Sequence, residues 1–80
     1  METKIAVIAI IVSKIEAVER VNTLLHEFRD EIIGRQGIPY REKGVSVISV
    51  VLDSDQSKLN ALSGKLGMIE GVSSKILLAK

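Results

Sequence analysis

The sequence contains no cysteine, no tryptophan and a single histidine, His26. Without cysteine the chain cannot form a disulfide and offers no thiolate to a metal ion, which excludes the usual sulfur-and-nitrogen zinc sites. This composition fits a reducing compartment, and we expect a cytoplasmic protein. The two aromatic residues, Phe28 and Tyr40, are too few to build a platform on which nucleic-acid bases could stack.

The chain also lacks a surplus of charge of either sign. It has 11 Lys and Arg residues and 10 Asp and Glu residues, which are intermixed along the chain and leave a net charge of +1. Binding to nucleic acid needs clustered positive charge, so we expect no direct nucleic-acid partner. The apolar run at 5–12 is far shorter than the roughly 20 residues of a membrane-spanning helix, so we expect no membrane partner either.

The residues that common catalytic mechanisms require are scarce. Nucleophilic and acid–base catalysis need a base that a third group holds in place, and one histidine without cysteine offers no such set. Several carboxylates lie near expected ends of strands and helices, where they suit turns and caps: Asp30, Glu31, Asp53 and Asp55. We therefore expect no enzyme activity, no catalytic residue and no cofactor. A metal ion that bridges two subunits through His26 stays open as an alternative.

The 80 residues are enough for one small domain, to which we assign the range 1–80. Continuous β-branched runs predict buried strands, and apolar residues at helical spacing predict amphipathic helices. Ser13 and Glu16 have the spacing of a capping box, and Gly67 suits the left-handed residue that follows a helix. These patterns predict strands at 4–12, 31–40, 45–53 and 72–79, and helices at 14–28 and 56–66.

This βαββαβ order predicts an α+β, ferredoxin-like sandwich. Right-handed crossovers give an antiparallel sheet with the strand order 4-1-3-2, so the strands at 4–12 and 45–53 are central. The strands at 31–40 and 72–79 form the edges, and both helices pack on one face of the sheet.

Both central strands are apolar on both faces, although two helices can cover only one face. The strand at 4–12 presents Ile5, Val7, Ala9 and Ile11 on one side and Ala6, Ile8, Ile10 and Val12 on the other. Covering ~400 Å² of this surface per subunit would contribute ~10 kcal/mol, which is of the same order as the cost of association. We therefore predict a homo-oligomer, a dimer or a tetramer, that uses the open sheet face and the edge strands.

The stretch "GRQGIPYREKG" at 34–44 concentrates glycine, proline and charge. Its glycines lie within and between two strands and precede no helix, so it does not match a dinucleotide-binding loop. We predict that 34–40 continues an edge strand, where Pro39 is tolerated. Glu42 and Lys43 suit the centre of a type I turn, with Gly44 in the left-handed position of a G1 bulge.

The same stretch supplies the predicted contacts with a ligand or a second subunit. The glycines leave room for close approach by another backbone or by a small-molecule effector, and the neighbouring side chains could bind it. The predicted ligand-binding or interface residues are Gly34, Arg35, Gly37, Tyr40 and Arg41, and no residue is assigned to a metal.

The segments "IIGRQGIPYREKGVSVISVVLD" and "LSGKLGMIEGV" resemble the family of iron-only hydrogenase system regulators, and the similarity extends over 4–79. That family resembles ACT regulatory domains and the C-terminal domain of the nickel-responsive repressor. The resemblance implies an oligomeric, ligand-sensing regulatory domain. Of the repressor's nickel-ligand positions, only one coincides with a possible ligand in this chain, His26. The other positions fall on Gly37, Pro39 and Val45, which cannot bind a metal. The turn "IVSKIE" lacks the glycine of many amino-acid-binding ACT domains.

Two functions follow as hypotheses. The first is a non-enzymatic oligomeric domain that regulates the hydrogenase system by sensing an effector or by binding a partner protein. The second is a metal- or cofactor-responsive sensor or chaperone for hydrogenase maturation, with His26 and carboxylates at a subunit interface.

Overall fold

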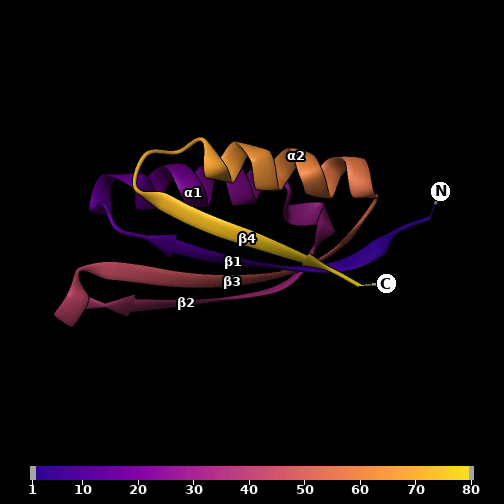
Figure 1. Cartoon of the computed structure of the whole chain (residues 1–80). Helices are drawn as coiled ribbons and strands as arrows, with labels where there is room; N and C mark the ends of the chain where they lie inside the picture. The colour runs from indigo at the N-terminus through magenta and orange to yellow at the C-terminus, as the bar shows by residue number, and fades with distance from the viewer. Residues whose placement is uncertain (1, 80) are drawn as a thin grey trace.

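The structure is a computed structural model that describes residues 2–79. Four strands and two helices follow one another in the predicted order, with a 3-10 turn on either side of the second strand (Figure 1). The strands are β1 (Lys4–Val12), β2 (Ile32–Tyr40), β3 (Val45–Ser54) and β4 (Val72–Leu78). The helices are α1 (Ile15–Glu27) and α2 (Gln56–Gly67), and the 3-10 turns are η1 (Arg29–Glu31) and η2 (Arg41–Lys43).

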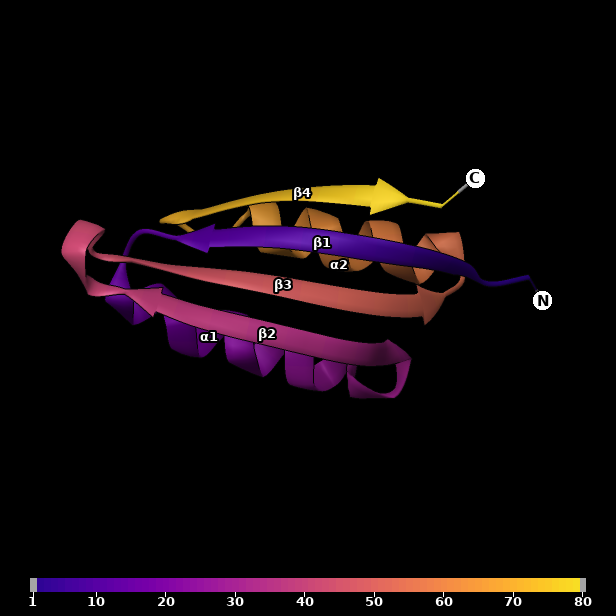
Figure 2. The same cartoon turned by 90° about the horizontal axis from the view of Figure 1, so that it is seen from below.

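The strands form one antiparallel sheet in the order β2-β3-β1-β4, which confirms the predicted ferredoxin-like topology. Both helices cover the same face of the sheet, and the opposite face has no layer against it (Figures 1 and 2). The central strand β1 pairs with β3 along its whole length, from Lys4 opposite Ser54 to Val12 opposite Ser46.

The core lies between the sheet and the two helices. Alternate residues of β1 point into it, as a strand with period 2 requires, and the apolar stripe of each helix meets them. The buried apolar residues are Ala6, Ile8, Ile10 and Val12 of β1, Ile48, Val50 and Leu52 of β3, Ala17, Val21 and Leu25 of α1, and Leu59, Leu62 and Leu66 of α2.

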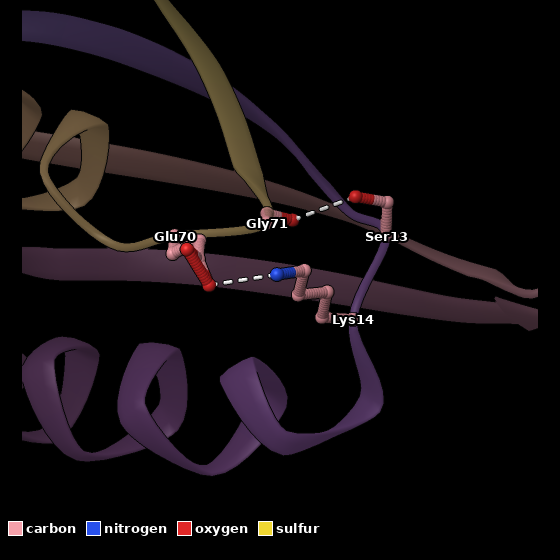
Figure 3. Close-up of polar contacts among 4 residues, drawn as sticks. All are labelled: Ser13, Lys14, Glu70 and Gly71. Carbon is pink, nitrogen blue, oxygen red and sulfur yellow. Dashed lines mark hydrogen bonds and ion pairs between the residues drawn. The ribbon is translucent and has the colours of Figure 1, made fainter.

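The predicted capping box at the start of α1 is wrong. Lys14 occupies the N-cap position and no side chain caps the helix, which begins at Ile15. Ser13 instead directs its backbone N–H to the carbonyl oxygen of Gly71 at 2.7 Å, and its hydroxyl donates to the same oxygen at 3.1 Å (Figure 3). The hydroxyl is therefore bound to the loop before β4 rather than to the first turn of its own helix.

The prediction for Gly67 is also wrong. Gly67 is the last residue of α2, and the C-cap residue Met68 keeps right-handed backbone angles. The left-handed residue of this loop is Gly71, with φ of 86°. The chain thus continues past the end of α2 before it reverses into β4. Asp55 caps the other end of the helix, because its carboxylate accepts a hydrogen bond of 2.9 Å from the N–H of Lys58.

The hairpin between β2 and β3 turns as predicted at its tip. The N–H of Gly44 donates to the carbonyl oxygen of Arg41 at 3.1 Å, and Gly44 is left-handed with φ of 64°. The predicted G1 bulge at Gly44 is wrong, since Tyr40 pairs directly with Val45. The irregularity of this hairpin lies at its other end, between Ile32 and Gly34.

Candidate functional site

The face of the sheet that the helices leave open carries two apolar patches. The first, the hairpin-end patch, is a row of three neighbours across β2, β3 and β1: Ile38, Val47 and Ile11. The second, the distal patch, joins residues of β3, β1 and β4: Val51, Val7, Leu77 and Ile5. The largest exposures are those of Leu77 at 71% and Ile38 at 51%.

A polar row separates the two patches. Gln36 of β2 pairs with Ser49 of β3, Ser49 pairs with Ala9 of β1, and Ala9 pairs with Lys75 of β4. The open face is therefore apolar at both ends of the strands and hydrophilic across its middle, a pattern that limits how a second surface can lie against it.

The structure confirms which residues of β1 lie on each face, and it adds residues that the sequence reasoning missed. Ile38 and Leu77 extend the apolar surface onto both edge strands, where they pair with Val47 and Val7. Only the register between strands shows that these side chains continue the central rows.

A groove opens on the other side of β2, between α1 and the β2–β3 hairpin. It consists of two neighbouring cavities of about 340 and 250 Å³ that share Val18, Pro39 and Ser46 in their walls. The larger cavity is also lined by Val12, Ile15, Tyr40, Arg41, Gly44 and Val45. The smaller is also lined by Asn22, Arg35, Gly37, Ile38 and Ile48.

The groove exists because β2 sends little side-chain volume toward α1 between Arg35 and the hairpin, where the helix-side residues are Gly37 and Pro39. Beyond the irregularity between Ile32 and Gly34, the residues of β2 on the helix side are Arg35, Gly37 and Pro39, which pair with Val50, Ile48 and Ser46 of β3. A Cβ atom added to Gly37 would meet no atom within 4 Å. The middle of β2 therefore stands above empty space rather than above packed core.

The charged residues that line the groove are both cationic: Arg35 and Arg41. The Nη2 of Arg35 donates to Oδ1 of Asn22 at 2.7 Å, so this guanidinium is held against α1 by a neutral partner. Within residues 2–79 the ion pairs are Lys14 with Glu70 and Lys58 with Glu31, and they involve neither arginine. The groove thus combines apolar walls with two guanidinium groups and no lining carboxylate.

The structure brings together most of the predicted ligand or interface residues. Arg35 and Gly37 line the smaller cavity, and Tyr40 and Arg41 line the larger one. Gly34 lies apart from them, on the open face of the sheet opposite Val51. A role for these residues in binding stays a prediction.

His26 lies on the exposed side of α1, and its carbonyl oxygen accepts a hydrogen bond from Nη1 of Arg29 at 3.1 Å. In the described part of the chain, no three His, Cys, Asp or Glu side chains come close enough together to hold a metal ion. None of the helices described for residues 2–79 has the length and apolar character needed to cross a membrane.

The sheet order, the two helices on one face and the open apolar face define a small ferredoxin-like domain of the ACT-like kind. The sequence profile of the family described as "TM1266-like: Iron-only hydrogenase system regulator, putative" matches residues 4–76, and the chain belongs to this family. Curated protein sequences gave no match.

Solved structures agree with this assignment. Uncharacterized protein TM1266 from Thermotoga maritima superposes with a TM-score of 0.94 at 40% identity, over 99% of this chain and 100% of that protein. The C-terminal domain of the MgtC protein from Mycobacterium tuberculosis gives a TM-score of 0.75 at 14% identity, over 95% of this chain and 87% of that domain.

A formyltetrahydrofolate deformylase from Pseudomonas putida KT2440 gives a TM-score of 0.64 at 18% identity, over 91% of this chain but only 28% of the enzyme. At these low identities the MgtC domain and the deformylase show a shared fold and nothing about activity.

Proposed function

We propose that the chain is a non-enzymatic regulatory domain of the iron-only hydrogenase system, which works as a homo-oligomer and senses a small-molecule effector. The observation that carries the proposal is the apolar open face of the sheet. The membership of the chain in the family of iron-only hydrogenase system regulators supports a regulatory role. The scarcity of catalytic side chains in the sequence supports a function without chemistry.

The occupant of the open face is a second copy of the chain. Exposed aliphatic side chains from all four strands gather there, and an apolar surface of several hundred Å² is unusual on a protein that stays monomeric. The polar row supports a symmetric partner. A two-fold axis parallel to the strands would set each apolar patch against its own copy, with Gln36 of the partner subunit opposite Lys75.

Sensing requires that an effector site and the subunit interface influence each other. Three residues belong to both surfaces: Ile38, Tyr40 and Val45 line the groove, and their pairing places them on the open face. A ligand in the groove would touch side chains at the rim of the proposed interface. This shared set supports coupling between effector binding and assembly.

The proposal is tested by the mass of the protein in solution. Light scattering coupled to size exclusion, at micromolar concentrations, should give at least twice the mass of one chain, which is 8.7 kDa. The apparent mass should fall on dilution if the interface is reversible. A sharp monomeric peak at every micromolar concentration would show that the open face does not pair.

The alternative function is a metal- or cofactor-responsive sensor or chaperone for hydrogenase maturation. It needs His26 at a subunit interface, but α1 lies on the face of the sheet opposite the proposed contact (Figure 2). Pairing through the open face would therefore keep the two histidines apart. Elemental analysis of protein purified without a histidine tag tests the alternative, which predicts stoichiometric metal that is lost in His26→Ala.

A further inference from the structure

We propose that the groove between α1 and the β2–β3 hairpin binds a small organic anion, with its carboxylate at Arg41 and an apolar body lying under β2 toward Gly37. This inference rests on the proposed sensing function and names the chemical class of its effector. The groove needs only one copy of the chain, because its walls come from α1, the end of β1 and the β2–β3 hairpin of the same subunit.

The size and walls of the groove suit a small molecule. The larger cavity alone, at about 340 Å³, falls within the range of small-molecule pockets. Val12 and Val18 line this cavity and Ile48 lines the smaller one, while Ile15 stands at the mouth of the groove with 86% of its surface exposed. Val12 and Ile48 are already buried, so the apolar surface that a ligand body would remove from water is that of Ile15 and of the half-buried Val18.

The charges of the groove select the ligand's head group. Arg41 is a lining residue of the larger cavity, and its fork of N–H donors matches the two oxygens of a carboxylate. Arg35, which is already bound to Asn22, adds positive potential from the far end. A ligand that carries a cationic head would meet two guanidinium groups and no lining carboxylate.

Gly37 supplies the room for the ligand's body. Its φ is not positive, so the backbone does not require glycine there, and its pairing with Ile48 is regular. Glycine weakens a strand relative to a β-branched residue, and in a strand it often marks a place of close approach by a ligand or another backbone. Here the missing side chain is what keeps the groove open between its two arginines.

Calorimetric titration with three anions tests the inference: hexanoate, decanoate and phenylacetate. Hexanamide and hexylammonium are the matched controls for hexanoate, because they keep a six-carbon apolar body and carry an uncharged or a cationic head group. Inorganic phosphate controls for attraction by charge alone. We expect at least one of the three anions to bind roughly tenfold more tightly than hexanamide, hexylammonium and phosphate do. No binding of any of the three anions at about 10 mM, or equal binding of hexanamide or hexylammonium, would overturn the inference.

Variants locate the site. Arg41→Gln should weaken the binding of the tightest-binding anion about tenfold. Gly37→Val should abolish binding, while the midpoint of thermal unfolding stays equal or rises because the new side chain enters open space. Lys43→Gln is the matched control, because Lys43 belongs to the same turn but lines neither cavity. Unchanged binding in Gly37→Val, or an equal loss in Lys43→Gln and Arg41→Gln, would contradict the site.

The oligomeric state is measured on the same samples, which separates the two proposals. An oligomer that binds none of the anions would support the proposed assembly and contradict the proposed class of effector. Anion binding by a monomer would support the groove as the binding site and contradict the proposed assembly.

Discussion

The carbonyl oxygen of Gly71 accepts two hydrogen bonds from Ser13, one from the backbone N–H at 2.7 Å and one from the hydroxyl at 3.1 Å, and Figure 3 shows the second. Beside them the Nζ of Lys14 lies 2.7 Å from a carboxylate oxygen of Glu70. These contacts join the turn after β1 to the turn before β4, so two loops far apart in the sequence are held as one unit. Gly71 can point its carbonyl this way because its φ of 86° is open to glycine.

Gly71→Ala should therefore destabilise the fold. A Cβ atom there would lie 2.7 Å from Cγ of Lys14, and the left-handed backbone would be strained, for a loss of about 1–3 kcal/mol in the free energy of unfolding. Urea denaturation followed by circular dichroism measures it. Gly64→Ala is the control, since it lies inside α2 with open space around it and should stabilise by about 0.5–1 kcal/mol.

Asp55→Ala should remove the cap of α2. The carboxylate satisfies the N–H of Lys58, which would otherwise have no intrahelical partner, so the loss should be about 0.5–2 kcal/mol in the free energy of unfolding. Asp55→Ser should recover most of that loss, because a serine hydroxyl can accept the same bond. Equal destabilisation by alanine and serine would mean that the cap is not the cause.

Ile11→Glu should dissociate the proposed oligomer. The side chain lies in the hairpin-end patch, 46% exposed in a single chain, and pairing would bury the new carboxylate without a partner. We expect the dissociation constant to rise by roughly 100-fold or more, measured by sedimentation velocity over a dilution series. Ile15→Glu makes the same replacement on α1, away from the open face, and should leave the mass unchanged.

Ile10→Ala and Ile11→Ala, neighbours on β1, should separate folding from assembly. Ile10 is fully buried under the helices, so its truncation should cost about 2–5 kcal/mol of unfolding free energy. Ile11 faces the other way, and its truncation should change the stability of the dilute, dissociated chain by less than about 0.5 kcal/mol. Thermal unfolding at low concentration makes the comparison, and a large loss for Ile11→Ala there would place that residue in the monomer core.

The sequence predicted the elements to within one residue at each end, because apolar spacing differs so clearly between strand and helix. It failed where a local motif competed with a distant contact. Ser13 has the right spacing for a capping box, but the loop before β4 lies close enough to bind its hydroxyl. Likewise Gly67 resembled a helix-ending glycine, whereas the reversal of the chain occurs at Gly71.

The candidate site shows the same limit. The irregularity between Ile32 and Gly34 shifts the alternation of β2 by one residue, which moves every later side chain to the opposite face. Counting from Ile32 would place Gly34 on the helix side, but the structure places it on the open face and sends Arg35 and Gly37 toward α1. A glycine inside a strand often marks a bulge, but "IIGRQGIPY" contains two, Gly34 and Gly37, and its pattern does not indicate which of them stands at the shift.

The sequence by itself determined the order of the elements, the fold class and the presence of more apolar strand surface than two helices can cover. Periodicity is a local property, so it can be read from neighbours along the chain. Only the tertiary structure decided the register across the sheet, the polar row between two apolar patches and the groove beside α1. These depend on which residues meet across strands and loops, and that is settled by the packing of the whole domain.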